Sequence, residues 1–304
     1  MVISLLVFLL ATACMIGRIE PFTSWYYVFS WWSYIGFAES WLHWKGLKSL
    51  LFQSPGRFLL QLPMSVTIWL VFELFNFRLQ NWHYVDVPSS LFLRWLGYAV
   101  SFATVLPGLN ATAALVRGIL PLDSPRWPPL VLRSESRRWV LGAGFLSLIV
   151  SLIWPGVFFP LVWLGFILVI GPLLRSTEHN ELIQGLESGK PGRFLELLLS
   201  GMICGFLWEV WNYWAGAKWI YTVPLVGWLK VFEMPLLGFL GFPPFAVECY
   251  LMSGLAFLLW DSIEKTDSPA RRWITRCLLG LALLVFWMLI FSGIDRNTVI
   301  SYGA

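Results

Sequence analysis

Charged residues are scarce in this chain: they make up 12% of its 304 residues, whereas 58% of the residues are hydrophobic. Soluble domains carry about 25% charged residues, so the composition excludes an ordinary soluble domain. The apolar runs are continuous rather than alternating, which predicts membrane helices and argues against a transmembrane β-barrel. The shortage of charge therefore indicates a protein that lies in a lipid bilayer.

The sequence also lacks the residue patterns of metal and nucleotide sites. Its four cysteines show no CxxC spacing, so neither a metal cluster nor a disulfide framework is predicted. The absence of HExxH, aspartate-rich magnesium, P-loop, GxSxG and CxxCH motifs removes support for common hydrolases, nucleotide users, aspartate-rich prenyltransferases and c-type haem proteins. His43 and His179 match in two loops but have no further ligand at a fixed spacing. No metal and no cofactor is expected.

Long apolar segments dominate what is present. About 20 helical residues cross a bilayer, and on this basis we predict nine spans: 2–17, 22–38, 57–80, 92–117, 138–155, 157–174, 193–214, 236–260 and 272–292. No Lys or Arg precedes the first apolar run, as a secretory signal would require. The first segment is therefore expected to be a structural helix and not a cleaved signal peptide.

The distribution of Lys and Arg predicts the orientation of these spans. With the N-terminus inside, fifteen of the 21 Lys and Arg residues fall in inner segments, as the positive-inside rule requires. We predict a multi-pass protein of the inner (plasma) membrane with a cytoplasmic N-terminus. The net charge of +4 is explained by this topology, so the bilayer is the expected partner and no nucleic acid is needed. The sequence gives no oligomeric state.

One passage of the chain occurs twice. Pro55-Gly56-Arg57-Phe58-Leu59, running on to Glu73-x-x-Asn76, returns 136 residues later as Pro191-Gly192-Arg193-Phe194-Leu195, running on to Glu209-x-x-Asn212, with eight of 22 positions identical. With a one-residue shift the match continues through Trp82-x-Tyr84 and Trp219-x-Tyr221. The repeat superposes spans one to four on spans five to eight.

Four spans is an even number, so the two copies have the same orientation in the membrane. Parallel repeats of this kind are related by an axis along the membrane normal. The predicted fold is an all-α polytopic membrane helix bundle of two tandem parallel four-helix repeats plus a ninth C-terminal helix. Its parts are residues 1–120, a cytoplasmic linker at 121–137, the second repeat at 138–260, and a C-terminal helix and tail at 261–304. The fourth unit of the second half is expected to break near Pro243.

Carboxylates within apolar helices are costly and indicate a functional site. Glu73 and Asn76 share one helix face, as do Glu209 and Asn212. Counting about 1.5 Å per residue places Glu209 and Glu248 at comparable depth in the outer half of the bilayer. We therefore expect a central polar site with Glu209, Glu248 and Glu73 as catalytic acids or bases, since clustered buried carboxylates suit proton transfer. Substrate is expected at Asn76, Asn212, Glu233, Trp208 and Trp211.

Structural interpretations of the same residues stay open. The Glu–Asn pairs can link spans three and seven by hydrogen bonds, as polar residues do between membrane helices. Tryptophan and tyrosine favour the membrane interface, so Trp208 and Trp211 can be packing residues instead of a cavity lining. The glutamates favour function more than the asparagines do, because a helix–helix hydrogen bond does not require an ionisable group.

The second half resembles the small membrane-embedded carotenoid enzymes, namely the heterodimer-type lycopene cyclases and the carotenoid hydratases. The similarity rests on about 50 residues, which carry Glu209, Trp219-x-Tyr221, Pro224, Gly227, Glu233-Met234-Pro235 and Pro243-Pro244-x-x-x-Glu248. The Pro-x-Glu-Glu signature of those cyclases is absent. The resemblance implies a compact multi-helix protein that uses membrane acids to protonate a polyene.

The leading hypothesis is an integral membrane protein with an intramembrane carboxylate and carboxamide site, doing acid/base chemistry on an apolar isoprenoid or lipid. A proton-coupled small-molecule transporter is the first alternative, because parallel repeats and mid-membrane acids are equally expected there. A non-catalytic membrane scaffold subunit is the second.

Overall fold

The computed structural model describes residues 1–131, 133–224 and 227–303, which are mostly helical. The α-helices are α1 (Val2–Ile16), α2 (Tyr26–Trp44), α3 (Leu50–Gln53), α4 (Pro55–Leu79), α5 (Leu91–Phe102), α6 (Val105–Ile119), α7 (Ser134–Ile153), α8 (Pro155–Phe158), α9 (Val162–Leu174), α10 (Glu181–Glu187), α11 (Gly192–Trp214), α12 (Phe242–Glu264) and α13 (Pro269–Asn297). Two 3-10 helices are η1 (Phe159–Leu161) and η2 (Leu236–Gly241). Short strands are β1 (Trp82–Val85), β2 (Val87–Pro88), β3 (Lys218–Tyr221), β4 (Lys230–Val231), β5 (Met234–Pro235) and β6 (Tyr302–Gly303).

Seven helical segments within the described residues are long and apolar enough to cross a membrane. They are Pro55–Leu79, Leu91–Ile119, Glu135–Ile153, Pro155–Leu174, Gly192–Trp214, Leu236–Glu264 and Pro269–Asn297. Each matches one of the nine predicted spans. The remaining two are α1, which has 15 residues, and α2, which is less apolar because it carries Glu39, His43 and many Trp, Tyr and Ser residues. Their crossing of the membrane stays a prediction.

The limits of α2 differ from the prediction. The helix extends from Tyr26 to Trp44, whereas the sequence predicted a span at 22–38. His43 therefore lies in a helix and not in a loop, and its ring stacks on Phe52 at 4.6 Å. The apolar run ends near Ala38, but the backbone continues as a helix because the residues that follow, from Glu39 to Trp44, include no glycine or proline that would end it.

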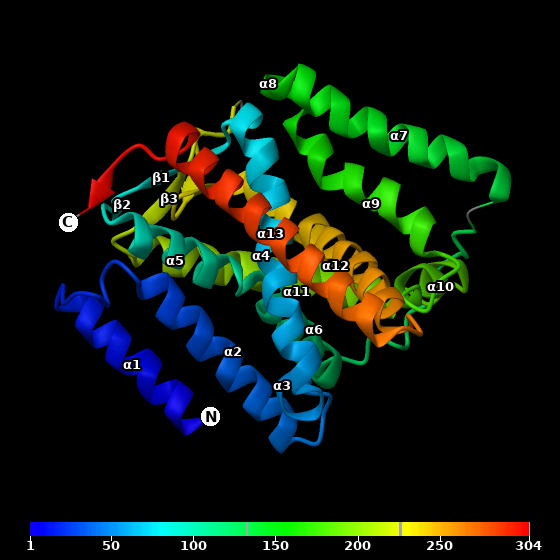
Figure 1. The fold of residues 1–304 in the computed structure, drawn as a ribbon, viewed down its shortest axis with the longest axis horizontal. Helices are drawn as coiled ribbons and strands as arrows, with labels where there is room; N and C mark the ends of the chain where they lie inside the picture. Colours follow the sequence, from blue (N-terminus) through cyan, green and yellow to red (C-terminus); the bar gives the residue numbers. More distant parts are fainter. Residues whose placement is uncertain (132, 225–226, 304) are drawn as a thin grey trace.

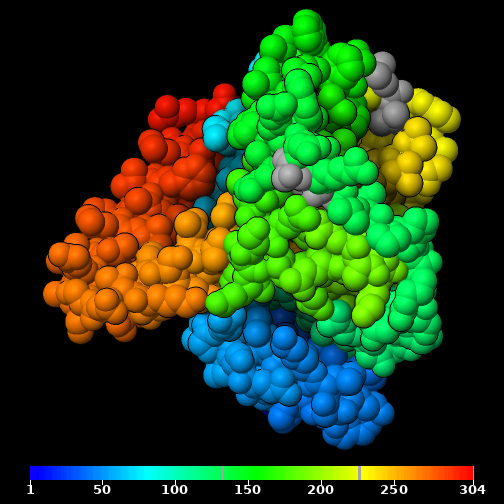
Figure 2. Space-filling view, turned by 90° about the vertical axis from the view of Figure 1, so that its right-hand side faces the viewer, coloured from blue at the N-terminus to red at the C-terminus, as the bar shows by residue number. Residues whose placement is uncertain are grey.

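Four helices form the centre of the bundle, with the pair α11 and α12 and the pair α4 and α6 packed together, and with α11 also against α6. The pair α1 and α2 covers one side of this centre and the pair α7 and α9 covers the other (Figure 1). Helix α13 packs mainly on α4. In Figure 2 the green segment from α7 to α10 lies above the blue N-terminal segment and beside the orange and red C-terminal helices.

Two ends of the bundle can be distinguished. The strands lie at one end, and α3 and α10 lie towards the other (Figure 1). At the strand end β1 pairs antiparallel with β3, so that Trp82 faces Tyr221 and Tyr84 faces Trp219. Each strand thus pairs with its counterpart in the sequence repeat.

Breaks near proline divide two of the long apolar segments. Helix α12 begins at Phe242, directly after η2, so Pro243 lies in its first turn. In the first half, α6 begins at Val105 and Pro107 is its third residue. Proline is tolerated in a first helical turn, where its missing N–H has no intrahelical partner. The break predicted near Pro243 is therefore present as a helix start.

The linker between the predicted halves is folded against α10 over the part that the structure describes. The Trp127 amide donates to the Gly189 carbonyl and the Leu130 amide to the Leu186 carbonyl, each at 3.0 Å. Residue 132 of the predicted 121–137 linker, and residue 304 of the C-terminal part, lie outside the described residues.

Candidate functional site

A cavity of about 460 Å³ lies at the strand end of the bundle. We call it the strand-end cavity. Its wall comes mainly from β1, β3, α2, α5, η1, η2 and the first turn of α12, with single residues from α4 and α11. It is largely aromatic, including Trp69, Trp82, Tyr84, Trp208, Trp219, Tyr221 and Phe245. Ligand sites in proteins are typically apolar cavities of this size with a few polar groups. The polar groups of this wall therefore define the candidate site.

Glu73 lies directly behind one part of the wall. Its Oε1 accepts hydrogen bonds from the Tyr84 hydroxyl at 2.5 Å, the Trp69 indole at 2.8 Å and the Trp82 indole at 3.0 Å. All three donors line the cavity, whereas the carboxylate does not. The carboxylate is fully buried, so it acts on the cavity through its aromatic donors.

Glu209 has the same arrangement in the second half. Its Oε1 accepts a hydrogen bond from the Tyr221 hydroxyl at 2.8 Å, and Tyr221 lines the cavity. Burial, followed by repulsion from the neighbouring glutamate, raises the pKa of Tyr84 and of Tyr221 well above the usual value. Both phenols therefore stay protonated at neutral pH, and each donates a hydrogen bond to its carboxylate.

Glu248 differs from the other two carboxylates. It is fully buried in α12, and neither carboxylate oxygen has a hydrogen-bond partner among the described side chains and backbone. Pro244 and Phe245, four and three residues earlier, line the cavity and share the helix face of Glu248. A buried carboxyl without a partner strongly favours the uncharged form, so this group is an acid held directly behind the cavity wall.

Asn76 and Asn212 form hydrogen bonds that fix the turns before β1 and β3. The Asn76 amide donates to the Trp82 carbonyl at 2.8 Å, and its oxygen accepts from the Asn81 amide at 2.8 Å. The Asn212 amide donates to the Trp219 carbonyl and its oxygen accepts from the Trp219 amide, at 2.8 and 2.9 Å. Neither asparagine lines the strand-end cavity, and each bonds within its own half of the chain.

Replacing either asparagine by leucine should therefore destabilise the fold. Asn76→Leu and Asn212→Leu leave buried backbone groups without partners, which costs about 2 kcal/mol at each site. Thermal unfolding of the purified variants in detergent, followed by tryptophan fluorescence, measures the loss. The matched control is Asn297→Leu, whose amide bonds only within the exposed end of α13. If Asn76→Leu were as stable as this control, the role in holding the strands would be excluded.

The other predicted substrate-binding residues occupy three different places. Trp208 lines the cavity, and its indole nitrogen has no hydrogen-bond partner in the described structure. Trp211 packs in the core against Trp31, with ring centroids 4.9 Å apart, and does not line the cavity. Glu233 forms an ion pair with Lys218 at 2.6 Å, and it is Lys218 that lines the cavity.

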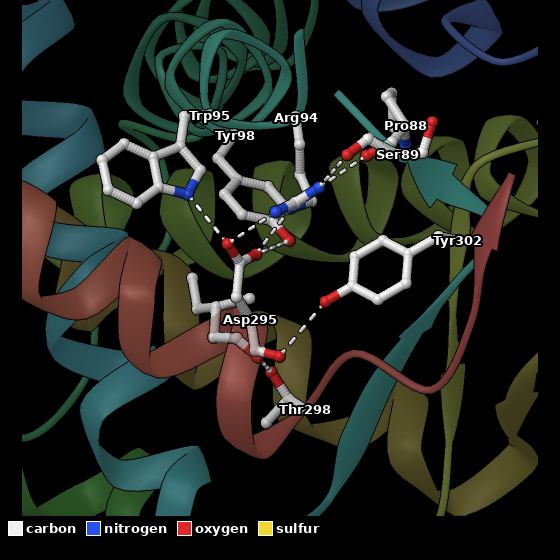
Figure 3. A network of polar contacts seen from close by, with 9 residues as sticks. Pro88, Ser89, Arg94, Trp95, Tyr98, Asp295, Thr298 and Tyr302 are labelled. Atoms are coloured by element: carbon white, nitrogen blue, oxygen red, sulfur yellow. Dashed lines mark hydrogen bonds and ion pairs between the residues drawn. The ribbon is translucent and has the colours of Figure 1, made fainter. Parts of the chain in front are cut away.

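Sequence reasoning missed the contribution of Arg94 and Tyr98. Both line the strand-end cavity and both bond to Asp295 of α13 (Figure 3). In the sequence Arg94 is only one of the six Lys and Arg residues outside the predicted inner segments. The sequence does contain a sign of this pair. Arg94 is the fourth residue of an apolar helix, where an arginine needs an acidic partner, and Asp295 is an acid near the end of the last apolar segment.

Comparison with protein-family models, curated proteins and solved structures finds no match for this chain. Within the described part of the chain, no three His, Cys, Asp or Glu side chains are grouped so that they could hold a metal ion. The function must therefore be inferred from the cavity and its carboxylates.

Proposed function

We propose that this protein binds an apolar isoprenoid or lipid in the strand-end cavity and acts on it by acid/base chemistry. One observation carries the proposal: an aromatic cavity whose hydroxyls, Tyr84 and Tyr221, are each bonded to a buried carboxylate of an apolar helix. Ionisable groups are costly in such surroundings and are kept where they function. The resemblance to carotenoid enzymes, which protonate polyenes with membrane acids, supports the same class of substrate.

The apolar ligand would enter from the lipid phase. Leu237 and Leu240 of η2 line the cavity and are exposed on the outside of the molecule. Leucines exposed in an apolar segment face lipid at little cost, so this rim can admit a hydrophobic molecule directly from the bilayer. Polar solutes fit the aromatic wall less well, because they would lose water without gaining enough hydrogen bonds.

The three carboxylates have different chemical roles in this proposal. Glu248, uncharged and without a partner, is the proton donor, and movement of the Phe245 ring exposes it to the ligand. Glu209 has one donor, Tyr221, and is the better base, since Glu73 is stabilised as a carboxylate by three donors. A proton-transfer pair of this kind contributes about 10²- to 10⁴-fold to a reaction rate.

The proposal includes two parallel four-helix repeats, related by a pseudo-twofold axis along the membrane normal, with α13 as the ninth span. The β1–β3 register supports it, because Trp82 pairs with Tyr221 while their counterparts, Trp219 and Tyr84, pair with each other. Such reciprocal pairing is what a twofold axis requires. The strand end then lies outside the inner membrane and the N-terminus in the cytoplasm, as the Lys and Arg distribution favours.

One observation favours the transporter alternative. A second cavity lies further along the same helices: Phe245 of α12 lines the strand-end cavity and Tyr250 lines the other. Five residues of helix separate these two positions, or about 7.5 Å at 1.5 Å per residue. Two cavities divided by so thin a layer also suit alternating access to a bound small molecule.

The test compares cells that produce the wild-type protein, Glu209→Gln, Glu248→Gln or the control Glu178→Gln, which changes an exposed acid. We expect each of the two buried variants to lose product at least about 100-fold in lipid and pigment extracts, with accumulation of its precursor. Unchanged extracts at equal protein levels would refute the enzymatic proposal. Proton-coupled uptake into proteoliposomes, lost in Glu248→Gln, would instead establish the transporter.

A further inference from the structure

The repeated Pro-Gly-Arg sequence has no part in the strand-end cavity. It begins α4 as Pro55–Arg57 and lies at the start of α11 as Pro191–Arg193. Both arginines line the second cavity, which has a volume of about 390 Å³. We call it the α10-end cavity, since Glu181 of α10 also lines it.

Positive side chains from several segments converge on this cavity. Lys48, Arg57, Arg117, Arg193 and His179 line it, together with the carboxylates Glu39, Glu181 and Glu196. Arg117 lies 2.9 Å from both Glu181 and Glu196, and Arg193 also pairs with Glu196. These pairs offset much of the charge of Arg117 and Arg193, although Nε of Arg193 makes no hydrogen bond to any described residue. Lys48 and Arg57 are the cations of the cavity with the weakest ionic contacts.

Lys48 and Arg57 form few close contacts with the neighbouring acidic side chains. Arg57 lies 3.7 Å from Asp261, and its side chain is 55% exposed. Lys48 forms no ion pair with any described residue. Glu39 is already engaged, since its Oε2 accepts hydrogen bonds from the Ser49 hydroxyl and the Leu51 amide.

Two buried nitrogen atoms in the same cavity lack hydrogen-bond partners in the described structure: Nε of Arg193 and Nε2 of His179. The carboxylate oxygen of Glu181 is 3.8 Å from the first, and that of Asp261 is 3.4 Å from the second without hydrogen-bond geometry. Arginine always carries a proton at Nε. A buried donor without an acceptor is costly, so this position is built for an acceptor that the chain itself does not provide.

The start of α4 adds to the positive potential. This helix has no side-chain cap and its first residues, Pro55 to Arg57, are exposed, so its first amides and the positive end of its dipole are accessible beside Arg57. The start of α11 is instead covered by the Leu122 carbonyl and the Asp123 carboxylate. Helix N-termini combined with arginine favour phosphate groups, which accept several hydrogen bonds at once. We propose that the α10-end cavity binds a phosphate group, held by Arg57 and Arg193 with Lys48 and His179 beside them.

The phosphate can belong to a lipid headgroup or to a free ion, since the chemistry of the site is shared. The proposal is independent of the function proposed for the strand-end cavity, because the phosphate ligands named here do not line that cavity. It gives the duplicated Pro-Gly-Arg sequence a binding role.

The test uses the full-length protein and two phosphate sources. Inorganic phosphate is titrated into detergent-solubilised protein with thermal unfolding as the readout, and nanodiscs with and without phosphatidate are compared by native mass spectrometry. The double variant Lys48→Gln/Arg57→Gln removes two cations with few partners, so it should fold. The matched control is Arg137→Gln/Arg138→Gln, which removes two exposed cations of α7.

We expect binding to the wild type and the control, and binding at least about tenfold weaker to Lys48→Gln/Arg57→Gln, because charge-assisted hydrogen bonds are lost. A response to inorganic phosphate identifies a free-phosphate site, and retention of phosphatidate alone identifies a headgroup site. No response to either source, or equal binding by the double variant and the wild type, would overturn the proposal.

Discussion

Gly201→Leu is expected to prevent the protein from folding, whereas Gly280→Leu should leave it intact. Gly201 lies where α11 crosses α12. A Cβ atom there would overlap the carbonyl oxygen of Phe242 and would lie 2.8 Å from the Cβ of Ala246. A backbone oxygen cannot rotate away as a flexible side chain can, so the two helices would have to separate.

The site of this contact makes the effect large. Gly201 and Gly205 are four residues apart, as in the small-residue packing of membrane helices, and a Cβ at Gly205 would overlap the ring of Phe242. Phe242 and Phe245 of α12 line the strand-end cavity. Separation of the helices would therefore damage both the central packing and the cavity, at a cost of more than about 3 kcal/mol.

Gly280 is the matched control for Gly201. It lies in α13, where a Cβ would meet nothing within 4 Å, and leucine is a better helix former than glycine. Expression followed by size-exclusion chromatography in detergent compares the two variants. A monodisperse Gly201→Leu protein with the unfolding temperature of Gly280→Leu would show that the α11–α12 contact is not required.

The long apolar segments could be predicted because their signal is local. A run of apolar residues and the prolines near Pro107 and Pro243 are sufficient to position the helices to within a few residues. The end of α2 could not be predicted, since it continues past the apolar run to Trp44. Hydropathy reports the environment of a segment, whereas helix limits also depend on the backbone preference of the residues that follow.

The candidate site was harder to predict than the helices. Counting residues predicts the depth of Glu73, Glu209 and Glu248 in the membrane, but not which way their side chains point. In the structure none of these three carboxylates lines the cavity. The tyrosines that connect them to the cavity follow 11 and 12 residues later, across a turn and a strand. The turn between each glutamate and its tyrosine removes any regular helical spacing, so the sequence did not show that these residues are bonded.

Arg94→Met is expected to destabilise the protein by about 3 kcal/mol, because it leaves a mostly buried carboxylate without its countercharge. Arg94 Nε and Nη2 donate to the two oxygens of Asp295 at 2.8 and 3.0 Å, and Tyr98 donates to the same carboxylate at 3.0 Å. Arg94 Nη1 also donates to the Pro88 carbonyl at 2.8 Å. Figure 3 shows the arginine between the start of α5 and the end of α13.

Thermal unfolding in detergent measures this loss, and limited proteolysis shows whether the C-terminal segment is released. The control Glu178→Gln breaks an exposed pair, with side chains 69% and 78% exposed, and should change the free energy of unfolding by less than about 1 kcal/mol. A stability of Arg94→Met equal to that control would contradict the prediction.

The double variant Arg94→Met/Asp295→Leu separates the two possible origins of the effect. If the cost of Arg94→Met is the uncompensated charge of Asp295, removing that charge as well should recover a large part of the stability. If the cost is instead the lost contact between α5 and α13, the double variant should be no more stable than Arg94→Met. Because Arg94 also lines the strand-end cavity, recovery would show that this cavity residue contributes to stability by neutralising the charge of Asp295.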